Sequence, residues 1–136
     1  LAMYPEERRL KRIRQTHNNM IVFSGAVEYH YMNKNYDIES VFSKLYAMEA
    51  LRILFPVNRV YLRDHKRIFE QVEELPENPP DYVRKILSLL WFKSQNVTYD
   101  EATWVINTVS ETKKAIENKM RSLGPDYVKW LAFTGQ

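Results

Sequence analysis

The stretch that decides the fold is NVTYDEATWVINTVSETKKAIENKMRSLGP, residues 96–125. Thr98, followed three residues later by Glu101, is a capping box, in which hydroxyl and carboxylate each accept a hydrogen bond from a backbone N–H at the helix start. The glycine and proline that close the stretch end a helix. Six residues between these signals recur at steps of three and four, the spacing of one helix face: Val105, Val109, Thr112, Ile116, Met120 and Leu123. The stretch therefore predicts a helix over Tyr99–Leu123, about 37 Å long.

Proline and asparagine divide the rest of the chain into shorter helical segments. We expect helices over 5–17, 36–55, 58–75 and 81–95, and a last one from 125 toward the C-terminus. Asn35 or Asp37 is expected to cap the second helix and Pro56 to end it. This second helix is the most apolar and is therefore expected to be central. Its expected inward residues are Val41, Phe42, Leu45, Met48, Leu51, Ile53 and Leu54, and its expected outward residues are Glu39, Ser43, Lys44, Glu49 and Arg52.

Residues 20–32 fit two kinds of structure. Apolar and polar residues alternate there with the period of a strand, and 59–63 is the other segment of similar character. Two short strands form an unstable sheet, however, and Met20, Val27 and Tyr31 also continue the apolar stripe of the preceding helix. We therefore predict a helix here, in an all-α, single-domain bundle of five to seven helices. The alternative is an α+β fold with a small strand pair at 20–32 and 59–63.

Length and composition limit the class of protein. The 136 residues and 16.3 kDa fit one domain over 1–136. The absence of cysteine excludes disulfides, cysteine-ligated metal and thiol nucleophiles. No apolar run approaches the ~18 residues of a membrane span, and the start of the chain lacks the apolar segment of a signal peptide. We therefore expect a cytoplasmic protein without a membrane partner. Leu1 and Ala2, which precede Met3, are expected to be a remnant of cloning.

The net charge of +3 is concentrated near the N-terminus. Residues 1–14 contain five cations and two glutamates, and the difference accounts for the whole +3. The candidate phosphate-contacting residues on this basic helix are Arg8, Arg9, Lys11, Arg12 and Arg14. The simpler interpretation, which we favour, is a solvated basic face with pairs such as Glu7 to Lys11.

A search for catalytic and metal-binding patterns finds none. The chain contains no glycine-rich phosphate loop, no G-x-S-x-G motif and no H-E-x-x-H motif. His17, His30 and His65 show no ligand spacing, so each is interpreted as a core-edge or surface residue. We therefore expect no enzymatic activity, no cofactor and no metal.

Two hypotheses of function remain. The first is a non-catalytic interaction or adaptor protein that binds a protein partner or itself, and the second is a nucleic-acid-binding accessory protein that uses the basic N-terminal helix. The small size, the lack of cysteine and the asparagine-rich and tyrosine-rich composition resemble phage or mobile-element accessory proteins in general character only.

The candidate partner-binding residues follow one flank of the long helix: Trp104, Thr108, Glu111 and Ala115. Tyr82 and Tyr127, each beside a cation, are further candidates for stacking on single-stranded nucleic acid.

Overall fold

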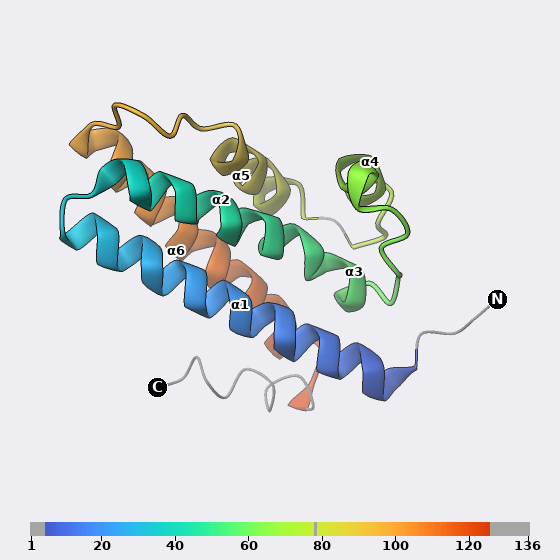
Figure 1. Ribbon diagram of the computed structural model, residues 1–136. Helices are drawn as coiled ribbons and strands as arrows, with labels where there is room; N and C mark the ends of the chain where they lie inside the picture. Colours follow the sequence, from blue (N-terminus) through green and yellow to red (C-terminus); the bar gives the residue numbers. More distant parts are fainter. Residues whose placement is uncertain (1–4, 78, 126–136) are drawn as a thin grey trace.

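The computed structural model describes residues 5–77 and 79–125, and every regular element in these ranges is a helix (Figure 1). The elements are α1 (Glu6–Met32), α2 (Tyr36–Arg52), α3 (Leu54–Val57), the 3-10 helix η1 (His65–Arg67), α4 (Ile68–Glu73), α5 (Pro80–Leu90) and α6 (Tyr99–Ser122). The predicted all-α bundle is confirmed. The strand-pair alternative is wrong, because 20–32 belongs to α1 and 59–63 forms no strand.

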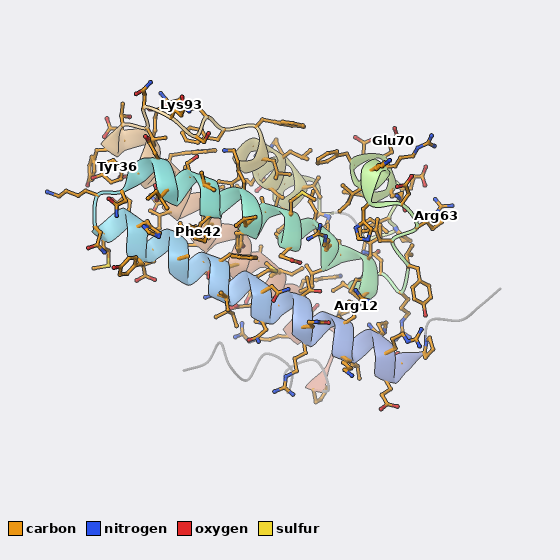
Figure 2. The ribbon with its side chains drawn as sticks, viewed as in Figure 1. Arg12, Tyr36, Phe42, Arg63, Glu70 and Lys93 are labelled. Atoms are coloured by element: carbon orange, nitrogen blue, oxygen red, sulfur yellow. The ribbon has the colours of Figure 1, made fainter. Side chains whose placement is uncertain are left out.

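Four helices, α1, α2, α5 and α6, enclose the core, and α3, η1 and α4 lie beside its end (Figure 1). At the opposite end the rings of Tyr31, Tyr36 and Tyr99 meet, with centroids 6.1 to 6.2 Å apart. Because α1 ends at this cluster while α2 and α6 begin there, α1 runs antiparallel to both. Tyr36 and Lys93 lie at this same end in Figure 2.

The long helix α6 agrees closely with its prediction. The Thr98 hydroxyl accepts a hydrogen bond from the Glu101 N–H at 3.3 Å, and the Glu101 carboxylate accepts one from the Thr98 N–H at 3.0 Å. Gly124 adopts φ +124°, the left-handed conformation expected after a helix end. The predicted stripe is buried from Val105 to Met120.

The first helix is longer than predicted. α1 is one continuous helix of 27 residues, so the predicted end near His17 is wrong, while the prediction of helix over 20–32 is confirmed. Thr16, His17 and Met20 are all buried, and this buried stripe continues through the expected boundary to Val27. Packing of one uninterrupted face against α2 and α6 therefore holds the helix together across the polar residues around Asn18.

The N-terminal half of α2 is turned the opposite way from its prediction. Glu39 and Ser43, expected outside, are 0% exposed, whereas Val41 and Leu45, expected in the core, are 47% and 44% exposed. The buried side carries small residues, which allow close approach of neighbouring helices, and its serine hydroxyls have backbone acceptors. The Ser43 hydroxyl donates to the Ser40 carbonyl at 2.6 Å, and the Ser40 hydroxyl donates to the Lys93 carbonyl at 2.6 Å.

The end of α2 also differs from the prediction. Pro56 does not end the helical segment but lies inside α3, after a break at Ile53. Proline has no N–H to donate to the carbonyl four residues earlier, so the helix is interrupted before it rather than after it. At the start of α2, Asn35 occupies the cap position without a side-chain bond, and Asp37 instead accepts a hydrogen bond from the Val97 N–H at 3.0 Å.

The predicted helix over 58–75 is only partly present, because residues 58–64 are irregular. Arg59 has φ +60°, and the Asn58 side chain donates to the Leu54 carbonyl at 2.7 Å, so both stop helix propagation. The Gln71 side chain fixes the irregular segment by accepting from the Arg63 N–H and donating to the Asp64 carbonyl. The helix predicted over 81–95 ends earlier, at Leu90. The helix expected from 125 lies outside the described residues.

Candidate interaction surface

Six large apolar side chains are exposed on the outer side of the α1–α2 hairpin, and we call this set the outer face. Their exposed fractions range from 44% to 71%. The outer face consists of Val22, Tyr29 and Met32 on α1 and Ile38, Val41 and Leu45 on α2. Contiguous exposed apolar surface of this kind is uncommon on monomeric soluble proteins and marks interaction sites.

Helical spacing explains why these residues reach the same side. Val22, Tyr29 and Met32 are seven and three residues apart, and Ile38, Val41 and Leu45 are three and four apart, so each set forms one line along its helix. At 100° per residue, both lines lie opposite the side of their helix that is buried. The core therefore cannot cover them.

Ring contacts join α1 to α2 beside these two lines. The Tyr29 ring meets the His30 ring edge-on at 5.1 Å, and the His30 ring stacks on Phe42 with centroids 5.3 Å apart. His30 and Phe42 are half-buried, and Figure 2 shows Phe42 where α1 and α2 lie side by side. The His30 and Phe42 rings thus join α1 to α2 next to the exposed side chains of the outer face.

Gly25 lies on α1 between the two ends of the outer face. No contact within the described chain requires a glycine at this position. It is exposed, and a Cβ added to it would meet nothing within 4 Å. Glycine inside a helix costs about 1 kcal/mol relative to alanine. The position therefore leaves space for a close neighbour that a single chain does not provide.

The outer face carries no charge on its own residues. Glu28, Lys34 and Asp37 are exposed near it, with both signs represented. The basic cluster lies toward the other end of α1, where Figure 2 shows Arg12. An uncharged face can pack against a copy of itself without bringing like charges together.

The structure divides the predicted basic residues into two groups. Arg8, Lys11, Arg12 and Arg14 are exposed along α1, as a phosphate-contacting helix requires. Arg9 is 0% exposed. Its guanidinium donates to the Glu6 carboxylate and to the Pro56 carbonyl, so this side chain anchors the start of α1 to α3. Arg9 is thus placed for packing and not for contact with a phosphate.

The predicted flank of α6 is partly covered by its own chain. The Trp104 ring lies 5.4 Å from the Phe92 ring, and its exposed fraction is 41%. Thr108 is buried, with its hydroxyl donating to the Trp104 carbonyl at 2.8 Å. Glu111 is exposed and accepts a hydrogen bond from the Lys85 ammonium at 2.9 Å.

Ala115, the fourth member of this flank, is exposed. Because α5 and the residues after it pack beside α6, the flank offers less free surface than the sequence indicates. Tyr82, one of the residues predicted to stack on bases, is also unavailable. Its ring is 4% exposed, and its hydroxyl donates to the Ala50 carbonyl at 2.7 Å, while Tyr127 lies outside the described residues.

The three histidines have separate environments. His17 is buried beside Glu117, His30 is half-buried on Phe42, and His65 is exposed. In the described ranges, no three histidine, aspartate or glutamate side chains gather closely enough to hold a metal ion. No helix within the same ranges has the length and apolarity needed to cross a membrane.

Comparisons with known proteins give no relative from which a function could be transferred. No protein-family model matches this sequence, and no match is found among curated proteins or among solved structures.

Proposed function

We propose that this protein acts by contact, without turnover, and that its outer face binds a second copy of the same chain. The observation that carries the proposal is the exposure of six large apolar side chains on the side of the α1–α2 hairpin opposite the core. The proposed contact surface lies on α1 and α2, whereas the sequence alone favours the flank of α6.

The shape of the face favours a copy as the partner. Two antiparallel helices, each with one outward apolar line, form half of a four-helix bundle, and a twofold copy supplies the other half. In a twofold contact each residue meets the same surface on its partner. The outer face is uncharged at its centre and is therefore compatible with itself. Gly25 then allows the two α1 helices to approach closely.

Sedimentation equilibrium at protein concentrations up to about 100 µM tests the proposal. The parent chain should sediment as a dimer at the upper concentrations. Leu45→Lys, which places a charge on the face, should shift the mass toward the monomer. A strictly monomeric mass for the parent across this range would overturn the proposal of a second copy.

Two further variants separate a specific interface from general stickiness. Among the described residues, Trp91 is the most exposed large apolar residue, at 72%. It lies outside the outer face, so Trp91→Ser should leave association unchanged. Gly25→Ala should raise the stability of the monomer by up to about 1 kcal/mol and yet weaken the dimer. Equal loss of association in Leu45→Lys and Trp91→Ser would show that the outer face has no special role.

A further inference from the structure

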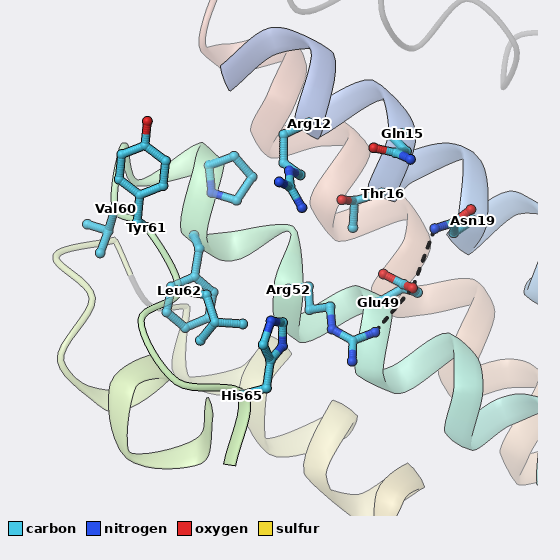
Figure 3. A pocket seen from close by; sticks show the side chains of 12 residues that line it. Arg12, Gln15, Thr16, Asn19, Glu49, Arg52, Val60, Tyr61, Leu62 and His65 are labelled. Carbon is cyan, nitrogen blue, oxygen red and sulfur yellow. Dashed lines mark hydrogen bonds and ion pairs between the residues drawn. The ribbon is translucent and has the colours of Figure 1, made fainter. Parts of the chain in front are cut away.

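A cavity lies where the basic half of α1 meets the end of α2 and the irregular segment before η1 (Figure 3). The cavity has a volume of about 360 Å³. Its polar lining includes Arg12, Asn19, Glu49, Arg52 and His65, and its apolar lining includes Phe55, Val60 and Leu62. A volume above about 300 Å³ with a few convergent polar groups is typical of small-molecule sites. This cavity is separate from the outer face, which occupies the other half of α1.

Arg12 and Arg52, which line the cavity, each have an N–H donor without an acceptor among the described residues. Arg12 is exposed, and no described residue pairs with its guanidinium. The Nε of Arg52 is buried without a hydrogen-bond partner among the described residues. Because this Nε is buried, a ligand in the cavity would contact the terminal nitrogens of Arg52, whose side chain is 37% exposed. Figure 3 shows Arg12, Arg52 and His65 around the same hollow.

Glu49 is the one acidic group among these lining residues, and its position is fixed. Its carboxylate accepts a hydrogen bond from the Arg52 guanidinium at 3.2 Å and one from the Asn19 amide at 3.4 Å. Glu49 therefore holds Arg52 in orientation at the edge of the cavity. With two arginines and one glutamate, and histidine counted as neutral, the lining has a charge of +1.

We propose that this cavity binds a small organic anion, with a phosphate or carboxylate head on an apolar body. Arginine presents a planar set of N–H donors that matches both heads, which makes Arg12 and Arg52 the groups that contact the charge. The side chains of Phe55, Val60 and Leu62 form the surface against which the apolar body packs. Inorganic phosphate alone would leave this part of the cavity unfilled.

Isothermal titration calorimetry with phenyl phosphate, benzoate and inorganic phosphate tests the assignment. Phenyl phosphate or benzoate should bind with a dissociation constant below about 1 mM, and inorganic phosphate should bind more weakly than phenyl phosphate. Tighter binding of phenyl phosphate assigns a phosphate head, and tighter binding of benzoate assigns a carboxylate head. Absence of heat from both aromatic anions at about 1 mM would overturn the proposal.

Matched variants distinguish the cavity from general attraction to a basic helix. Arg12→Gln and Arg52→Gln should each weaken binding about tenfold or more, because each removes a charge-assisted contact. Arg8→Gln, one helical turn before Arg12 and outside the cavity lining, should change the affinity less than about twofold. Arg12 is exposed, so its variant remains folded and informative even if Arg52→Gln is not. Equal losses for Arg8→Gln and Arg12→Gln would overturn the proposal.

Discussion

The imidazole Nε2 of His17 on α1 lies 3.2 Å from a carboxylate oxygen of Glu117 on α6, and both side chains are buried. These residues are 100 positions apart in the sequence. A second buried contact joins α2 to α6, since the Tyr46 hydroxyl is hydrogen-bonded to Thr112 at 2.8 Å and donates to the Val109 carbonyl. Polar contacts thus fix how three helices pack within an apolar core.

Removing one member of the buried pair should destabilise the fold. Glu117→Ala leaves the His17 imidazole Nε2 without its hydrogen-bond partner inside the core, and we expect a loss of about 1 to 3 kcal/mol in the free energy of unfolding. Urea unfolding followed by circular dichroism measures it. Glu111→Ala, on the exposed side of the same helix, is the control and should cost less than about 1 kcal/mol. Equal effects would mean that the buried contact contributes nothing specific.

The altered orientation of α2 leads to a second prediction, which compares Leu45 with Ile116. The sequence placed both in the core, but Leu45 is 44% exposed and Ile116 is 1% exposed. Ile116→Ala should cost about 2 to 5 kcal/mol, because it leaves a cavity in the core. Leu45→Ala should cost the isolated monomer less than about 1 kcal/mol, measured by urea unfolding at low protein concentration. Comparable losses at low concentration would contradict the exposed position of Leu45.

Most of α6 was predictable because its signals are local. The Thr98–Glu101 cap, the spacing of the stripe and the glycine and proline at the end all lie within one segment. The side of α2 that faces the core was not predictable in this way. Its apolar residues cover more than half the circumference, and burial of the serines depends on acceptors such as the Lys93 carbonyl, far along the chain.

The candidate sites could likewise be predicted only in part from the sequence. The exposed cations of α1 were visible in the sequence, but the outer face was missed because Val41 and Leu45 were assigned to the core. The sequence did contain a signal for the outer face, because α2 has more apolar residues than its core-facing side can bury. The cavity was missed because Arg12, Arg52 and His65 come from three distant segments, which only the packing of α1 against the end of α2 brings together.

The third prediction concerns the cap of α6. Thr98→Ala removes the acceptor for the Glu101 N–H and should cost about 1 kcal/mol of unfolding free energy. Ser110→Ala, at an exposed position in the middle of the same helix, should be neutral or slightly stabilising because alanine has the higher helix propensity. Thermal melting of both variants makes the comparison. A cap variant that melts with the parent chain would show that tertiary packing alone sets the start of α6.

The last prediction is a pH dependence that arises from Glu39. Its side chain is 0% exposed, and neither carboxylate oxygen accepts a hydrogen bond from a described residue. Burial raises the pKa of Glu39 from 4.5 to about 8, so the folded protein binds this proton more tightly than the unfolded chain does. The free energy of unfolding should therefore fall as the pH rises from about 5 to 8, by up to about 1.4 kcal/mol per pH unit, and level off above that range. Glu39→Gln, which carries no titrating proton, should remove this fall in urea unfolding at about pH 5, 7 and 9, whereas exposed Glu28→Gln should retain it. The same slope in parent and Glu39→Gln would mean that another group is responsible.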